Sequence, residues 1–379
     1  MQTPVHVLHL LTTIIPNGGV QKLILGYAEQ VSRHGVIFDY VAQGQGDPEL
    51  EQRCRDDGSQ IFYVPEMTKH PIGFTKALYQ LLRAHPEYRI IHVHQNFLNF
   101  IPLLTAKAAK TDVRISHSHN SYATSRLKKL VRGVSRFLIQ RTATELWGCS
   151  KLAYGWLYGK PFAESPHIYI LHNAIDASRF AFLPERRAAL RCGAGLQDEF
   201  VCICVANLSA LKNQSLLLDA MKALQAAQPE RPVVLWLVGE GSIRPALEEK
   251  CRQLGLESSV RFLGRRTDVP ELLLQADCFL LPSHAEGLPV SVVEAQMSGL
   301  PCILSANITR EVALRDDVVF LDIGDGNVPA WARQILTFSR MKIDRETPLP
   351  QDCGYDIEKE GEKLAAKYKA LAAAAQKNG

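Results

Sequence analysis

The sequence predicts an α/β protein built from two doubly wound parallel-sheet domains and a C-terminal helix. Short apolar runs typical of buried strands alternate with longer segments of helical periodicity, which favours parallel strands connected by helices. The alternation begins again at residue 200, after residues 179–197, whose charged residues, proline and glycines are typical of a linker. A chain of 379 residues is long enough for two such domains. We expect domains at residues 1–180 and 181–355, followed by a helix within 356–379.

The first half contains the apolar runs of one mostly parallel sheet. Expected strands are residues 5–11, 36–41, 61–64, 90–94, 113–116, 146–150 and 168–171. Expected helices are residues 20–33, 74–84, 98–109 and 126–141, with another starting at residue 152. Polar residues follow several of these strands, at the edge where open parallel sheets bind their ligands.

The second half repeats the alternation. Expected strands are residues 200–205, 232–238, 260–263, 278–281 and 302–304. Expected helices are residues 214–225, 243–254, 270–275 and 289–298, followed by the C-terminal helix at 361–375. Loops after these strands contain Lys212, Gly241 and Arg265. A cation and glycines at strand ends are typical of a site for a phosphorylated ligand.

Residues 282–299 hold the most informative pattern in the chain. Pro289-Val290 fits the first turn of a helix, and Gly299 fits the position just after its end. A helix start at the carboxyl end of a strand offers free backbone amides and a positive dipole end, which suits a phosphate. Glu286 precedes this helix and Glu294 lies within it among apolar residues, where a carboxylate usually has a specific partner. The alternative is that Glu286 caps backbone amides and Glu294 is solvated.

Composition and charge narrow the class of protein. Nine cysteines, with only Cys202 and Cys204 closely spaced, favour a reducing compartment over a disulfide framework or a zinc site. No Lys or Arg precedes the first apolar run, so we expect no secretory signal, and we expect no membrane span because uncharged apolar runs fall short of ~18 residues. Residues 1–178 carry 19 Lys and Arg against 13 Asp and Glu, whereas residues 179–379 carry 24 against 26. This asymmetry favours an anionic partner for the first half but does not indicate nucleic acid.

Gly18 and Gly19 stand between the first expected strand and the first expected helix. They allow a ligand to approach the backbone and leave the first amides of the helix open to an anion. The spacing is not the GxGxxG of a dinucleotide site. The alternative is a tight turn that binds nothing.

Residues 126–141 predict a basic amphipathic helix. Apolar residues at helical spacing alternate with cations, and no acidic residue interrupts them. The cations expected to face an anionic membrane surface are Arg126, Lys128, Lys129, Arg132 and Arg136. The alternative is a packed helix with a solvated basic face.

Two such domains place two carboxyl-end edges across a cleft, which is a common position for a ligand. The first domain contributes Gly18, Gly19, His92, His94, His117 and His119; the second contributes Lys212, Gly239, Gly241, Arg265, Glu286 and Glu294. The second set suits a nucleotide with a diphosphate and a ribose. The chain lacks a Walker P-loop, and the spacing of its His, Cys and Asp residues does not indicate a metal.

The pattern resembles retaining glycosyltransferases of family 4, which have the GT-B fold of two Rossmann-like domains, and the resemblance covers nearly the whole chain. It rests on Glu286-x7-Glu294 with Gly287, Pro289, Ala295 and Gly299, on Gly18-Gly19, on His92-Val93-His94, on residues 114–120, 173–176 and 262–265, and on Lys212-Asn213, Asp268-Val269 and Trp331. The run His117-Ser118-His119-Asn120 and residues 309–311 resemble the branch that builds bacterial exopolysaccharide and capsule. The GT-B fold also implies that the C-terminal helix crosses back to the first domain.

The resemblance implies a role for each site residue. Glu294 would hold the ribose, while Glu286 with the backbone of Leu288, Pro289 and Val290 would hold the sugar and its phosphate. Lys212 would neutralise the diphosphate, Gly18 and Gly19 would close over it, and Gly241 and Arg265 would line the rest of the donor site. His117 would lie near the anomeric carbon, with His94, His119 and Asn120 as acceptor or secondary contacts. Such enzymes use no metal.

Asn207 departs from the family, which usually has an arginine there. Losing one cation beside a diphosphate could cost a few kcal/mol of transition-state stabilisation, unless Lys212, Arg265 or Arg266 compensates. The expected activity is transfer from a UDP-sugar to a lipid-linked saccharide, by a cytoplasmic protein that associates peripherally with the membrane. The alternatives are a nucleotide-sugar epimerase of the same fold and a nucleotide-sugar-binding scaffold that has lost catalysis.

Overall fold

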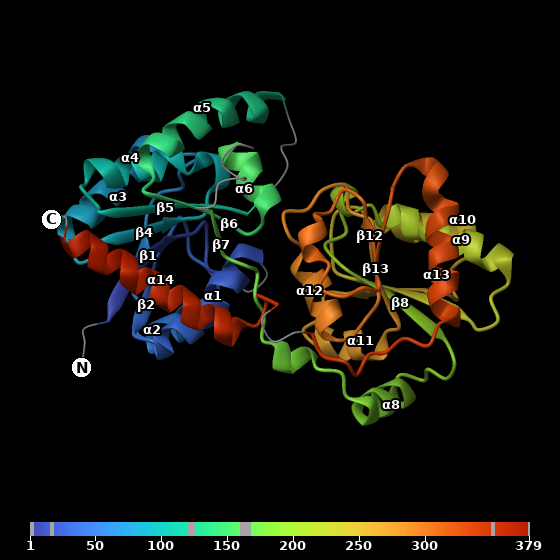
Figure 1. Cartoon of the computed structure of the whole chain (residues 1–379). Coiled ribbons are helices and arrows are strands. Elements are labelled where there is room, and N and C mark those ends of the chain that lie inside the picture. Colours follow the sequence, from blue (N-terminus) through green and yellow to red (C-terminus); the bar gives the residue numbers. More distant parts are fainter. Residues whose placement is uncertain (1–3, 16–18, 120–125, 160–167, 350–352, 378–379) are drawn as a thin grey trace. The chain divides into compact units, whose positions relative to one another are not determined.

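The computed structural model describes residues 4–15, 19–119, 126–159, 168–349 and 353–377, without the side chains of residues 22, 126–131 and 325. The chain forms two compact units. Unit 1 is Met1–Ile175 together with Gly354–Gly379, and unit 2 is Asp176–Cys353. The boundaries expected from the sequence lie at residues 181 and 356. Each unit is a parallel sheet covered by helices, as predicted (Figure 1).

Unit 1 contains a seven-stranded parallel sheet in the order β3-β2-β1-β4-β5-β6-β7. Its strands are β1 (Val5–Leu10), β2 (Val36–Ala42), β3 (Ile61–Tyr63), β4 (Ile90–Val93), β5 (Val113–Ser118), β6 (Glu145–Gly148) and β7 (Tyr169–Ile170). Its helices are α1 (Gly19–Arg33), α2 (Pro48–Asp56), α3 (Pro71–Ala84), α4 (Phe100–Ala108), α5 (Arg126–Thr142), α6 (Lys151–Tyr158) and α14 (Ile357–Lys377), with a 3₁₀ turn η1 (Asn96–Leu98). The chain leaves β1 toward β2 on one side and leaves β4 toward β5 on the other, so the topological switch point lies between β1 and β4.

Unit 2 contains a six-stranded parallel sheet in the order β10-β9-β8-β11-β12-β13. Its strands are β8 (Phe200–Val205), β9 (Val233–Val238), β10 (Val260–Gly264), β11 (Cys278–Leu281), β12 (Cys302–Ser305) and β13 (Val318–Leu321). Its helices are α8 (Pro184–Gly193), α9 (Gln214–Ala227), α10 (Arg244–Leu254), α11 (Val269–Gln275), α12 (Val290–Met297) and α13 (Val328–Arg340). The 3₁₀ turns are η2 (Ala177–Phe180), η3 (Ala210–Lys212), η4 (Arg310–Val312) and η5 (Asp325–Asn327). Here the switch point lies between β8 and β11.

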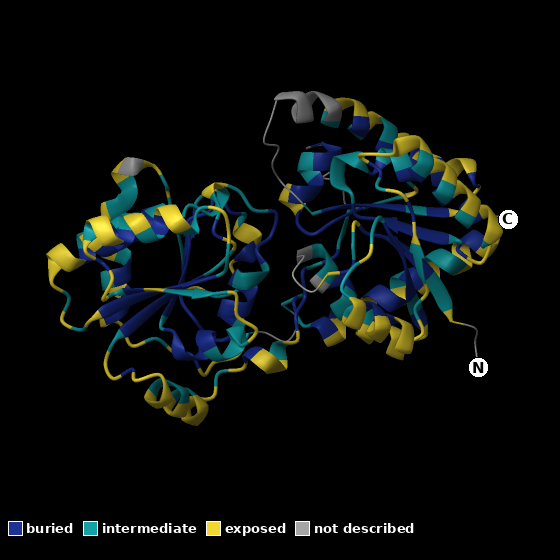
Figure 2. Ribbon diagram, turned by 180° about the vertical axis from the view of Figure 1, so that it is seen from behind, coloured by how far each residue is buried: buried dark blue, intermediate teal, exposed yellow. Residues whose placement is uncertain are grey.

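The C-terminal helix α14 returns to unit 1 and packs against α1 on one face of the sheet (Figure 1). A parallel bridge between Ile175 and Asp356 fixes its entry. Leu364 and Tyr368 of α14 are buried in the same apolar cluster as Tyr27 of α1. The central strands of both units are buried, the edge strands β3, β7 and β13 are less buried, and the outer helix surfaces are exposed (Figure 2). The burial of Leu364 and Tyr368 holds α14 in place as part of unit 1.

Four elements differ from the sequence-based prediction. Residues 48–56 form α2 although the stretch is polar, because Pro48 starts the helix and Asp47 caps it by accepting from the amide of Leu50 at 3.0 Å. The predicted linker at 179–197 is wrong in that it contains α8, which Arg187 and Arg191 tie to Asp277. Strand β13 and helix α13 were not predicted.

Over the described residues, no helix is long and apolar enough to cross a bilayer.

Candidate active site

The first group of candidate residues lies at the switch point of unit 2. Lys212 ends η3, which follows β8, and Glu286 lies in the loop between β11 and α12. Since β8 and β11 are neighbours in the sheet, the topology brings together two residues 74 positions apart in the sequence. The amide of His284 donates to the carbonyl of Leu211 at 2.8 Å, which joins the two loops.

Lys212 and Glu286 form a largely buried ion pair. The Nζ atom of Lys212 contacts Oε1 of Glu286, and the two side chains are 21% and 11% exposed. The hydroxyl of Ser283 donates to the same carboxylate oxygen at 2.7 Å. Glu286 is therefore not a solvated residue, since its carboxylate is oriented by a cation and a hydroxyl. The sequence predicted Lys212 and Glu286 as site residues but not Ser283.

Helix α12 begins directly beside this group. Val290 is its first residue, and Pro289 is the extended N-cap, with φ −75° and ψ 115° and no side chain that can accept a hydrogen bond. Pro289 therefore supplies no side-chain cap, the amide of Val292 donates to the Pro289 carbonyl at 3.2 Å, and the positive dipole end of the helix lies at this loop. Leu288 is buried, and Glu294 is 5% exposed in the second turn. The alternative of a solvated Glu294 is therefore wrong.

The glycines of the β9–α10 loop have a structural reason. Gly239 has φ +137°, and a Cβ atom there would lie 2.1 Å from the carbonyl oxygen of Ala206. A Cβ atom at Gly241 would lie 2.0 Å from the carbonyl oxygen of Leu208. The amide of Leu208 also donates to the carbonyl of Glu240 at 3.0 Å, which packs this loop against the loop after β8. Close packing alone explains both glycines, and donor binding by Gly241 stays a prediction.

Asn207 and Arg265 are exposed at the ends of β8 and β10. The carbonyl of Asn207 accepts from the side-chain amide of Gln214 at 3.0 Å, which fixes the loop but leaves the Asn207 side chain at the surface. Arg266 is paired with Asp268 at 2.5 Å. Arg266 and Lys212 are thus both paired with a carboxylate, and because the Lys212 pair is the more buried one and lies at the switch point, Lys212 is the better candidate to replace the family's arginine, followed by Arg265.

The second group of candidate residues is a row of five histidines on one face of the unit 1 sheet: His9, His92, His94, His117 and His119. His9 of β1 is the register partner of His92 of β4, and side chains on a strand alternate with a period of two. The pairs 92/94 and 117/119 therefore point to the same face, next to the switch point. His9, His92, His94 and His117 are buried, and His119 is partly exposed.

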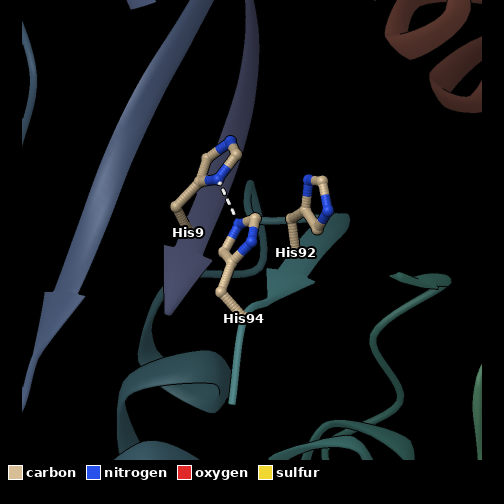
Figure 3. Close-up of side chains that lie close together, drawn as sticks. All are labelled: His9, His92 and His94. Carbon is tan, nitrogen blue, oxygen red and sulfur yellow. Dashed lines mark hydrogen bonds between the residues drawn. The ribbon is translucent and has the colours of Figure 1, made fainter. Parts of the chain in front are cut away.

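Hydrogen bonds connect these rings into two chains. In the first chain, Nδ1 of His9 lies 3.0 Å from Nε2 of His94, and Nδ1 of His94 lies 2.9 Å from Nε2 of His119. The second chain joins the Tyr368 hydroxyl to Nδ1 of His92 at 2.7 Å, and Nε2 of His92 to Nδ1 of His117 at 3.1 Å. Figure 3 shows His9, His92 and His94, with the dashed line joining His9 and His94. Each of these contacts needs one donor atom and one acceptor atom, which constrains where the ring protons lie.

Burial keeps the five imidazoles neutral. Removal from water lowers the pKa of His9 and of His119 to about 3. The pKa values of His92, His94 and His117 also fall well below 6.5, first through burial and then through repulsion by the neighbouring imidazoles. A neutral imidazole carries a single ring proton, so each histidine has one donor and one acceptor nitrogen.

The structure adds three site residues that the sequence analysis missed, and two predicted site residues lie outside the part of the chain that the structure describes. His9 belongs to the histidine row, and the hydroxyl of Tyr368 contacts the row at His92. Ser283 belongs to the Lys212–Glu286 group. The strand alternation in residues 5–11 places His9 on the same face of the sheet as Val7. This was the one signal in the sequence that could have identified His9. Gly19 is the first residue of α1. Gly18 and Asn120 lie outside the described residues.

Comparisons with known proteins agree with this architecture. Residues 17–179 match the family model described as Glycosyltransferase Family 4, and residues 199–340 match the model described as Glycosyl transferases group 1. The glycosyltransferase EpsF of Bacillus subtilis is 33% identical, covering 81% of this chain and 80% of its own. The UDP-Gal:alpha-D-GlcNAc-diphosphoundecaprenol alpha-1,3-galactosyltransferase of Escherichia coli is 26% identical, covering 66% of this chain and 67% of its own.

Solved structures share the fold. HepE of Anabaena, crystallised with UDP and glucose, superposes with a TM-score of 0.71 at 18% identity, covering 98% of each chain. WaaG, a glycosyltransferase involved in lipopolysaccharide biosynthesis, superposes with a TM-score of 0.68 at 18% identity, covering 97% of this chain and 98% of its own. The two parallel α/β units and these matches define a glycosyltransferase of the GT-B fold. This chain belongs to glycosyltransferase family 4.

Proposed function

We propose that this glycosyltransferase moves a sugar from a UDP-sugar to a lipid-linked saccharide, with retention of configuration and without a metal. The observation that carries the proposal is the group of Lys212, Glu286 and Ser283 beside the start of α12. A lysine and the positive dipole end of a helix at the switch point are features that suit a diphosphate. The expected products are exopolysaccharide, capsule or O-antigen precursors.

The relatives support this choice of substrates. HepE has been crystallised with UDP-glucose, and the E. coli relative is named for a UDP-galactose donor and a diphosphoundecaprenol-linked acceptor. In the proposed complex, Glu294 holds the ribose, while Glu286 and the backbone of residues 288–290 hold the sugar and its phosphate. Arg265 lines the base pocket, with Gly18, Gly19 and Gly241 completing the donor site. His117 contacts the transferred sugar, and His94, His119 and Asn120 contact the sugar or the acceptor.

The proposed step forms one bond and breaks one bond at the anomeric carbon. The acceptor oxygen bonds to this carbon on the face from which the diphosphate leaves. The bond between the carbon and the diphosphate oxygen breaks, and its electron pair departs with UDP. A phosphate oxygen takes the acceptor's proton, and Lys212 stabilises the charge that grows on the leaving diphosphate. Because Glu286 already pairs with Lys212, it serves as an orienting group in this proposal rather than as an acid or base of a hydrolase.

The test is a transfer assay with a panel of UDP-sugars and a short lipid-diphosphate-linked saccharide, in buffer containing EDTA. We expect one UDP-sugar to give a product whose anomeric proton coupling matches that of the donor, at a rate unaffected by EDTA. Loss of activity in EDTA, restored by Mg²⁺ or Mn²⁺, would overturn metal independence, and an inverted product would overturn retention. Conversion of the UDP-sugar without acceptor would identify an epimerase. Donor binding without transfer or donor hydrolysis would identify a scaffold.

We also propose that α5 docks on an anionic membrane surface. Val134 and Phe137 are 60% and 53% exposed on one face of this helix. Arg132 lies over the Trp156 ring at 5.0 Å, on the other side of the helix, whereas Arg141 lies over the Phe137 ring at 4.3 Å and places a cation beside the exposed face. Arg136 donates to the carbonyls of Trp156 and Leu157, both at 3.0 Å, so we leave it out of the lipid contact. The side chains of Arg126, Lys128 and Lys129 lie outside the described residues. Exposed apolar residues flanked by cations are typical of helices that lie in a membrane interface.

Reversing the charge of Lys128, Lys129 and Arg132 to Glu is expected to weaken binding to phosphatidylglycerol-containing vesicles at least tenfold, because each basic residue near such a surface contributes about 1 kcal/mol. Vesicle co-sedimentation measures this. The matched control reverses three exposed cations of the same unit, Lys76, Arg83 and Lys110, for the same change in net charge. Equal loss in both variants would show only a nonspecific charge effect, and no loss in either would leave α5 as a solvated basic helix.

A further inference from the structure

The five histidines of the buried row in unit 1 are connected by more hydrogen bonds than contact with a sugar would need. Two triplets, His9/His92/His94 and His94/His117/His119, place ring nitrogens within 4.8 Å of one another. A zinc ion needs nitrogens at about 2.0–2.1 Å from one point, with their lone pairs free. Both nitrogens of His92 are engaged, with Tyr368 and with His117, and both nitrogens of His94 are engaged, with His9 and with His119. The row is therefore better described as paired proton donors and acceptors than as a metal centre.

The Tyr368 hydroxyl fixes the direction of one of the two chains. Tyr368 is fully buried on α14, and burial raises the pKa of its phenol well above 10, so the hydroxyl keeps its proton. Among the described side chains and backbone groups, its hydrogen-bond partner is Nδ1 of His92 at 2.7 Å. A buried hydroxyl that donates to nothing is costly. The phenol therefore donates to His92, and Nδ1 of His92 carries no proton.

The position of the proton on His92 also determines the position of the proton on His117. A neutral His92 without a proton on Nδ1 carries its proton on Nε2 and donates to Nδ1 of His117 at 3.1 Å. His117 then accepts at Nδ1 and carries its own single proton on Nε2. This Nε2 is buried and has no hydrogen-bond partner in the part of the chain that the structure describes. A buried N–H without a partner is rare in folded proteins, so this N–H is placed to donate to an oxygen of a ligand or of a water.

The other chain has no such anchor. Its ends are Nε2 of His9, which is also without a partner among the described residues, and the partly exposed His119. Either direction of proton donation satisfies the contacts of His94 equally well. The defined tautomer thus belongs to His117 and depends on a tyrosine supplied by the returning C-terminal helix.

We infer that Tyr368 is a positioning residue, which acts through His92 to fix His117 as an Nε2–H donor toward an oxygen of the bound substrate. His117 therefore gives a hydrogen bond and does not serve as a general base. The identity of that oxygen, on the sugar or on the acceptor, rests on the proposed function; the tautomer does not. The inference also gives α14 a chemical role besides packing, because it brings Tyr368 to the histidine row.

The test is ¹⁵N NMR of the full-length protein labelled at histidine, with His117 and His92 assigned from the spectra of His117→Gln and His92→Gln. We expect both rings to show a protonated Nε2 and an unprotonated Nδ1. In Tyr368→Phe the preference for the Nε2–H tautomer is lost. The ratio of the Nε2–H to the Nδ1–H tautomer of His117 is expected to fall tenfold or more, seen as ¹⁵N shifts that move toward intermediate values. The matched control is Tyr27→Phe, which removes another buried hydroxyl from the same face, one that donates to the His172 carbonyl at 2.9 Å. This control is expected to leave the His117 shifts unchanged.

Three results would overturn the inference: an Nδ1–H tautomer at His117 in the wild type, unchanged His117 shifts in Tyr368→Phe, or stoichiometric zinc in the purified protein with metal-shifted histidine signals. The NMR readout needs no substrate, so its failure is separate from failure of the transfer assay. If transfer is detected, Tyr368→Phe is expected to lower kcat more than Tyr27→Phe does. If transfer is not detected while the tautomers are as expected, only the proposed function fails.

Discussion

The Lys212→Met variant is expected to transfer sugar ~10²–10³-fold more slowly than the wild type, the range typical of losing one preorganised group that stabilises developing charge. Lys212 is held at the switch point of unit 2 by Glu286, and Ser283 orients that carboxylate at 2.7 Å. The methionine keeps an unbranched side chain that is one atom shorter, and it removes both the charge and the N–H donor to Glu286. Since Asn207 supplies no cation where the family has one, the dependence on Lys212 should be strong.

The measurement is kcat with the UDP-sugar selected in the transfer assay, and the control is Lys222→Met on the exposed side of α9. Breaking a buried ion pair also destabilises a protein, so folding needs its own check. The double variant Lys212→Met/Glu286→Gln removes both charges and is expected to regain thermal stability without regaining activity. A loss of less than tenfold in Lys212→Met would contradict the role of Lys212 and move the cationic role to Arg265.

Much of the fold could be predicted because its signals are local. The strands at residues 200–205 and 278–281 have the boundaries expected from their apolar runs. The start of α12 was also foreseen, because Pro289 and the apolar turn after it identify a helix start without any tertiary information. Helix α8 was missed because its stability comes from contacts far along the chain, where Arg187 and Arg191 reach Asp277.

The candidate site was predicted less completely than the fold. Glu286 and Lys212 were each selected, but their pairing follows from the adjacency of β8 and β11, which no local pattern reveals. The contact of Tyr368 with His92 spans 276 positions and depends on the return of α14 to unit 1. Strand ends show which residues share an edge of a sheet, but they do not show which of those residues donate and which accept.

Acidification is expected to destabilise unit 1 far more than unit 2. His9, His92, His94 and His117 are buried and neutral, with pKa values lowered by burial, to about 3 for His9. In the unfolded chain each has a pKa of about 6.5 and takes up a proton below that pH. The unfolded state then binds more protons than the folded state, so the free energy of unfolding is fully present above pH 6.5 and falls as the pH drops from 6.5 toward 3.

The expected size follows from about 1.4 kcal/mol for each pKa unit and each group. Between pH 7.5 and pH 5.5, each of the four buried histidines costs about 1.4 kcal/mol, which together is on the order of 5 kcal/mol. A domain has about 5–15 kcal/mol of stability in total, so unit 1 should come close to unfolding at pH 5.5. Unit 2 is an internal control, because its one histidine, His284, is exposed.

Hydrogen exchange measured by mass spectrometry, corrected for the intrinsic effect of pH, separates the two units. Peptides from β4 and β5 should lose protection at pH 5.5, while peptides from β8 and β11 keep it. The His9→Gln variant replaces one titrating ring with a neutral side chain and should reduce the pH dependence of unit 1 by about one proton. An equal loss of protection in both units, or an unchanged pH dependence in His9→Gln, would show that the histidine row does not control acid stability. Because the same burial keeps His117 neutral, a positive result would also support its assignment as a hydrogen-bond donor at neutral pH.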